Sequence, residues 1–130
     1  MKKGIRILII LVVILGLMSL IGYIVIQNMN KNLDGLVEIE IEDFDLSSIN
    51  DGTYEGSYKA FPIEVIVNVT VSNHVITDIE LVKHVSGQGA PGEAVINLVI
   101  TEQSLDVDLI AGATYSSKVI LLAIEDALKN

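Results

Sequence analysis

A long apolar segment occupies the N-terminal part of the chain. Residues 7–26 contain no charged residue and consist mostly of Ile, Leu, Val, Gly and Met. An α-helix needs about 20 apolar residues to cross the hydrocarbon core of a bilayer, and it satisfies its own backbone hydrogen bonds there. The pattern therefore predicts a single transmembrane helix.

A cleaved secretory signal peptide is the alternative interpretation of this segment. Signal peptides have an apolar region of roughly 7–15 residues and end in small residues at the cleavage site. The segment here is longer, and residues 24–29 contain no such site. The chain also has no cysteine, which excludes a lipid anchor on cysteine. We therefore expect the helix to be retained.

Basic residues indicate the orientation of the helix. Lys2, Lys3 and Arg6 precede the apolar segment, whereas only Lys31 follows it closely. Because positive residues tend to remain on the cytoplasmic side, we expect a cytoplasmic N-terminus. The chain from about Gln27 onward is then extracytoplasmic, and the protein is expected in the cell membrane as a single-pass protein.

Beyond residue 50 the apolar positions alternate as they do in half-buried strands. A turn signal at 50–52 is followed by a strand pattern over 53–58, and Val or Ile then recurs at every second position over 63–71. A turn after Ser72 leads to a further strand over 75–82. Period-two alternation across short turns predicts antiparallel pairing.

Two helical patterns follow the strands. Apolar residues have helical spacing over 93–104 and again from Ser116 to Leu128, with Ser116 as the expected N-cap. Residues 106–110 between them are predicted to be a short strand or an extended segment. The fold class is α+β: an antiparallel sheet with two helices packed on one face, preceded by the transmembrane helix.

The residues between the membrane segment and this domain are polar and acidic. Residues 28–50 predict a solvated stalk, with a short edge strand inside it as an alternative. The expected organisation is a cytoplasmic tip and anchor over 1–27, an acidic stalk over 28–50 and a folded domain over 51–130.

The distribution of charge restricts the partners of the extracytoplasmic part. All 17 acidic residues follow the apolar segment, together with five of the eight basic ones, so this part carries a net charge of −12. Nucleic-acid binding is excluded because it needs clustered Lys and Arg. Protein partners are expected to present a positive surface.

Hydroxyl side chains and a glycine meet where the last helix begins. Gly112 is followed by Thr114, Ser116 and Ser117. A helix N-terminus presents free N–H groups and a partial positive charge, which favour a phosphate. The alternative is that these hydroxyls only cap the helix and that Gly112 only forms the turn.

The same stretch resembles the flavinylation motif of the FMN-binding domain family. That motif has an acidic residue, variable residues, Ser or Thr, and then Gly-Ala-Thr. Asp108 matches the acid, Gly112 and Ala113 match Gly-Ala, and Thr114 matches the final threonine, whereas Ala111 stands where the family has Ser or Thr. The opening at 51–56 and the hairpin through Ile79 are also similar, so the resemblance extends from Asp51 to Leu128.

The resemblance implies a covalently bound flavin. In the family a flavin transferase takes FMN from FAD and joins its phosphate to the threonine, which implies a phosphoester on Thr114. The glycine-rich loop 86–92 and Tyr115 are expected to contact the flavin ring, although of the family's acid-Thr-Pro-Gly segment only Pro-Gly is present. The cofactor-binding residues implied are Asp108, Gly112, Ala113, Thr114, Tyr115, Ser116 and Ser117.

We therefore expect an electron carrier that exchanges electrons with redox proteins still to be identified, rather than an enzyme with its own substrate. A reductase is disfavoured because no acid–base group accompanies the loop. The alternative function is a membrane-tethered binding or scaffold module with the same fold and no cofactor. With no cysteine present, His74 and His84 predict no metal site, and we expect both to be solvent-exposed turn residues. The alternative for His84, which lies near the glycine-rich loop, is that it approaches the flavin.

Overall fold

The computed structural model describes residues 1–87 and 89–129. It divides into two compact units, Met1–Asn32 and Leu33–Asn130. From Lys2 onward the first unit is helical and belongs to helix α1, Lys2–Glu38. This helix is long and apolar enough to cross a membrane, and the side chains of its apolar segment are exposed. α1 also continues through the polar residues that follow that segment.

The second unit contains a three-stranded antiparallel sheet in the order β1-β2-β3. The strands are β1 (Gly52–Ala60), β2 (Ile63–Ser72) and β3 (Val75–Val85). β2 and β3 are joined at Asn73 and His74, which both have positive φ, as a two-residue hairpin turn of this kind requires. The predicted strands and their antiparallel pairing are confirmed.

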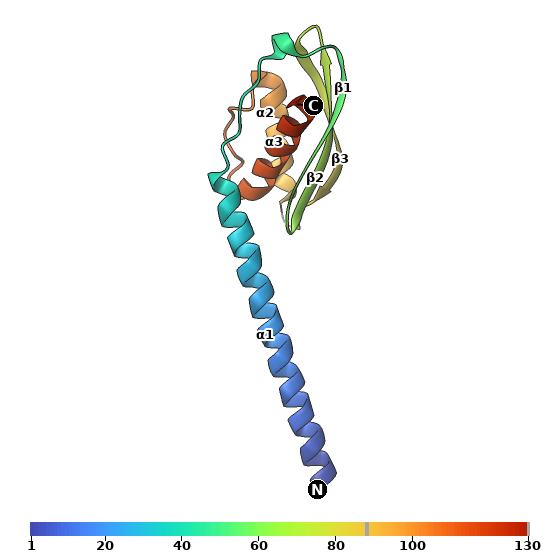
Figure 1. Ribbon diagram of the computed structural model, residues 1–130, viewed down its shortest axis with the longest axis vertical. Helices are drawn as coiled ribbons and strands as arrows, with labels where there is room; N and C mark the ends of the chain where they lie inside the picture. The colour runs from blue at the N-terminus through green and yellow to red at the C-terminus, as the bar shows by residue number, and fades with distance from the viewer. Residues whose placement is uncertain (88, 130) are drawn as a thin grey trace. The chain divides into compact units, whose positions relative to one another are not determined.

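Alternation along β2 creates the core. Its apolar residues at every second position are at most 6% exposed and face helix α3, Thr114–Lys129, which packs on β1 and β2. Helix α2, Val95–Glu102, packs on β3 and α3. Both helices cover the same face of the sheet (Figure 1), so the predicted α+β class is confirmed. The buried β2 residues are Ile63, Val65, Val67, Val69 and Val71.

The helical boundaries differ from the predicted ones. A 3₁₀-helix, Ala90–Ala94, comes before α2, and the C-cap residue of α2, Gln103, has the left-handed conformation. Helix α3 begins at Thr114, so the expectation that Ser116 is its N-cap is wrong. The reason is the turn at Gly112, whose φ is 79°; it allows Ser117 N–H to donate to the Ala113 carbonyl at 3.0 Å. Residues 106–110 form neither a strand nor a helix.

The segment after α1 packs on the domain. Residues 39–50 contain no strand, only a short 3₁₀-helix, Leu46–Ser48, so the alternative of an edge strand is not observed. Leu36 is 2% exposed, and the partly buried apolar side chains that follow it contact the core. The C-terminal half of the expected solvated stalk is therefore in contact with the domain, because the apolar residues of the stalk are partly buried there. Those apolar residues are Ile41, Phe44, Leu46 and Ile49.

Candidate functional site

The loop before α3 is held in place by one buried serine. Ser117 is fully buried, and its hydroxyl lies 2.9 Å from the Ala113 carbonyl and 3.1 Å from the Thr114 carbonyl. The same oxygen accepts the Ile110 N–H at 3.2 Å. Ser117 thus fixes the turn that presents Thr114, and it does so from beneath the loop.

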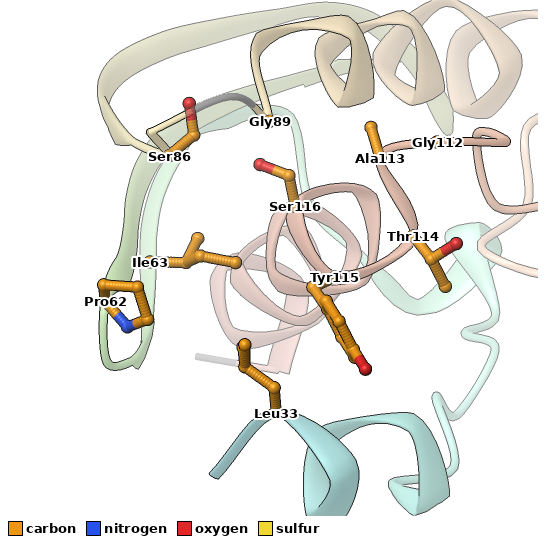
Figure 2. Close-up of a pocket in the computed structure, with 10 residues that line it drawn as sticks. All are labelled: Leu33, Pro62, Ile63, Ser86, Gly89, Gly112, Ala113, Thr114, Tyr115 and Ser116. Carbon is orange, nitrogen blue, oxygen red and sulfur yellow. The ribbon is translucent and has the colours of Figure 1, made fainter. Parts of the chain in front are cut away.

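A cavity of about 220 Å³ lies at this helix end. Figure 2 shows its lining residues, with the Tyr115 ring and Leu33 together on one side and Ser86 and Gly89 on another. The walls are mainly apolar side chains and backbone, which suits a flat aromatic ligand with few polar groups. The lining residues are Leu33, Pro62, Ile63, Ser86, Gly89, Gly112, Ala113, Thr114, Tyr115 and Ser116.

Thr114 stands at the edge of this cavity as the first residue of α3, and it is exposed. The backbone N–H groups of Thr114, Tyr115 and Ser116 have no acceptor among the described residues. Free first-turn N–H groups carry the positive end of the helix dipole. The site therefore combines an accessible hydroxyl with donors suited to an anion.

Ser116 takes part in a chain of hydrogen bonds that the sequence did not predict. Its Oγ lies 2.5 Å from Nε2 of His84, and Nδ1 of His84 lies 2.7 Å from Oε1 of Glu93. The side chain of His84 is 4% exposed, so the expectation of a solvent-exposed turn residue is wrong for this histidine. His74 is exposed and lies 3.2 Å from the Leu46 carbonyl.

A β-bulge in β3 explains why the alternation of the sequence did not predict the burial of His84. Leu81 pairs with Val67, but Lys83 pairs with Ile66 and His84 with Val65, so Val82 is an extra residue in β3. Such a bulge reverses the parity of the strand. His84 therefore shares the helix-facing side of the sheet with Val65, whereas simple alternation after Leu81 places it on the opposite side.

Asp108 lies apart from the other predicted site residues. It is exposed and lines a different hollow of about 230 Å³, together with Glu102 and Asp106. The cavity at α3 brings together Gly112, Ala113, Thr114, Tyr115 and Ser116, with Ser117 beneath them. Within residues 1–87 and 89–129, no group of three or more potential ligands could hold a metal ion.

The fold and the cavity define a small α+β ligand-binding domain. In the sequence this domain follows a helix able to cross a membrane. The sequence profile of the FMN-binding domain family matches residues 59–129, more than half of the chain, and the chain belongs to that family. No curated protein matches the chain. The residues at the cavity fit FMN, because the apolar walls suit its ring and the free N–H groups suit its phosphate.

Proposed function

We propose that this protein is a membrane-anchored electron relay with FMN esterified to Thr114. The observation that carries the proposal is the position of Thr114, whose exposed hydroxyl lies at the edge of the cavity beside free N–H groups. Family membership supports FMN as the ligand. Ser117 fixes the loop through the carbonyl groups of Ala113 and Thr114, whereas the Thr114 hydroxyl has no hydrogen bond to the described residues, so its modification breaks none.

Attachment requires a flavin transferase and FAD. A bond forms between Oγ1 of Thr114 and the phosphorus of the FMN portion, the pyrophosphate bond of FAD breaks, and AMP leaves. The threonine hydroxyl proton is released. The charge that remains on the phosphodiester is offset by the N–H groups of the first turn of α3, where the helix dipole is positive.

The bound flavin supplies the redox chemistry, and the chain supplies placement and electrostatics. A cavity of about 220 Å³ is smaller than the roughly 300–1,000 Å³ of enclosed ligand pockets, so the ring is only partly covered. Partial exposure suits exchange of electrons with another protein. The net charge of −12 beyond the apolar segment favours redox partners with a positive surface.

Helix α1 supports the proposed location. Its length and apolar character support a single membrane span, and Lys2, Lys3 and Arg6 at its start support a cytoplasmic N-terminus. The FMN-binding domain then acts at the outer face of the membrane. A covalent link retains the cofactor there, where a dissociated flavin is lost to the cell.

Replacement of the acceptor hydroxyl tests this proposal. With a flavin transferase co-expressed, Thr114→Ala should lose all flavin fluorescence that survives denaturation, because the phosphoester has no oxygen to form on. Thr101→Ala, at an exposed threonine of α2, is the matched control and should keep the signal of the wild type. Covalent flavin in Thr114→Ala would show that the attachment site is another residue.

Two observations favour a second candidate, a membrane-tethered binding or scaffold module without flavin. Ala111 replaces the hydroxyl residue of the motif, and Asp108 lies outside the cavity. The same experiment separates the candidates. A wild-type protein without covalent flavin, produced beside a control protein that the transferase does modify, would favour the scaffold module.

A further inference from the structure

Three side chains form a continuous hydrogen-bonded chain that ends in the cavity wall. Glu93 follows Pro91-Gly92 in the 3₁₀-helix, His84 lies near the end of β3, and Ser116 lies in the first turn of α3. The distances are 2.7 Å from Glu93 Oε1 to His84 Nδ1 and 2.5 Å from His84 Nε2 to Ser116 Oγ. The three residues come from separate elements, and the fold alone brings them together.

The positions of the protons follow from the chemistry of the partners. An ionised carboxylate only accepts hydrogen bonds, so in the neutral imidazole Nδ1 carries the proton and donates to Glu93. Nε2 is then an acceptor and receives the Ser116 hydroxyl proton. A nucleophile bonded to a base that a third group orients is the arrangement that activates a serine.

The surroundings of these three side chains match the role of an activated serine. His84 is shielded from water, with its side chain 4% exposed, while Glu93 is about half exposed. Ser116 lines the cavity although it is only 2% exposed, and Figure 2 shows its hydroxyl directed toward Ser86 and Gly89. Free N–H groups of Thr114 and Tyr115 lie in the same helical turn, where they can stabilise an oxyanion.

From this geometry we infer that Ser116 is a nucleophilic serine that accepts acyl or phosphoryl groups from small activated esters, with His84 as its general base and Glu93 as the residue that orients His84. In the acyl-transfer step Ser116 Oγ bonds to the carbonyl carbon, its proton passes to His84 Nε2, and the alcohol of the ester leaves with that proton. No electrons are gained or lost. The cavity of about 220 Å³ restricts the reacting group to a small one.

This reactivity is independent of flavin attachment. It concerns Ser116 rather than Thr114, and it requires neither FAD nor a transferase. The protein without flavin therefore tests it. Failure of this inference leaves the proposed electron relay untouched, and failure of the relay leaves Ser116 reactive.

Labelling with diisopropyl fluorophosphate tests the inference. Ser116 Oγ forms a bond to phosphorus, the P–F bond breaks, fluoride leaves and the hydroxyl proton passes to His84. We expect one adduct on the full-length, flavin-free protein in detergent micelles, mapped to the peptide that contains Ser116. Ser116→Ala should take up none. His84→Gln should slow labelling by about a hundredfold or more, as is typical for loss of a general base.

Two controls make the result specific. His74→Gln removes the exposed histidine at the opposite end of the hairpin and should label at the wild-type rate. Glu93→Gln should slow labelling less than His84→Gln does. The inference would be overturned if the wild-type protein carried no adduct on Ser116 under conditions that label a serine esterase completely. A folded His84→Gln variant that labels at the wild-type rate would overturn it as well.

Discussion

Asp43 connects the segment after α1 to the loop after α2. Its carboxylate lies 2.8 Å from Ser104 Oγ and accepts the Leu105 N–H at 3.1 Å and the Phe44 N–H at 3.0 Å. Burial alone would raise the pKa of Asp43, but these three hydrogen bonds favour the ionised form and lower the pKa below 3.8 overall. The ionised side chain is therefore the form that stabilises the fold.

The lowered pKa of Asp43 predicts that the free energy of unfolding decreases at acidic pH. A lowered folded-state pKa contributes stability that is present above the unfolded value of 3.8 and is lost as the pH falls through the folded value. Asp43→Asn should lower the free energy of unfolding at pH 7 and should flatten its decline below about pH 4. Urea unfolding of both proteins in micelles at pH 7 and pH 3 measures this.

Asp34→Asn is the matched control for Asp43→Asn. Asp34 is an exposed residue of α1, so its replacement should change stability at pH 7 by no more than about 0.5 kcal/mol, as is usual at the surface. An Asp43→Asn protein as stable at pH 7 as Asp34→Asn, with an unchanged acid profile, would show that Asp43 does not stabilise the domain.

At the scale of single residues, the sequence identified local features of the site and missed the long-range ones. Gly112, Ala113 and Thr114 are adjacent in the chain, so a motif could place them together, and they do line one cavity. His84 was missed because its inward direction depends on one extra residue in β3, which alternation cannot reveal. No signal in the sequence joins positions as far apart as His84 and Ser116.

At the scale of elements, the packing of α3 on β1 depends on Gly56. A Cβ atom at this position would lie 2.1 Å from the carbonyl oxygen of Ala123 and 2.4 Å from the backbone nitrogen of Ala127. Both are backbone atoms of a helix, so they cannot move aside as the end of a side chain can. The two elements therefore approach each other at a distance that only glycine allows.

Gly56→Ala should consequently destabilise the domain by about 3 kcal/mol or more, at the upper end of the usual cost of overpacking. Gly35→Ala is the control, because a Cβ there meets nothing within 4 Å. Alanine is the better helix former, so this change in α1 should be neutral or stabilising by up to about 1 kcal/mol. Equal stabilities of the two variants in urea unfolding would contradict the close packing of α3 on β1.

The elements themselves were more predictable than their boundaries and contacts. Val and Ile at alternate positions defined β2, because only one of its faces is buried. The start of α3 was misplaced by two residues, since serine at 116 and 117 suggested a cap while the turn at Gly112 starts the helix earlier. The contact between residues 39–50 and the core was not predicted, because acidic residues alternate there with the apolar ones that become buried.

At the scale of the whole molecule, the proposed orientation can be tested with single cysteines, since the chain has none of its own. Thr101→Cys places a thiol on the exposed side of α2, and Gly4→Cys places one before the apolar segment. In intact cells a membrane-impermeant maleimide should label Thr101→Cys, and it should label Gly4→Cys only after lysis. The reverse pattern would place the domain in the cytoplasm.

The central claim is that Thr114 carries FMN, and intact mass spectrometry tests it most directly. The full-length protein is produced with and without a flavin transferase, and its peptides are then mapped. We expect the transferase to add the mass of one FMN less one water, located on the peptide that contains Thr114. An unchanged mass, with a control protein fully modified in the same cells, would contradict the claim and leave a domain of this family that holds no covalent flavin.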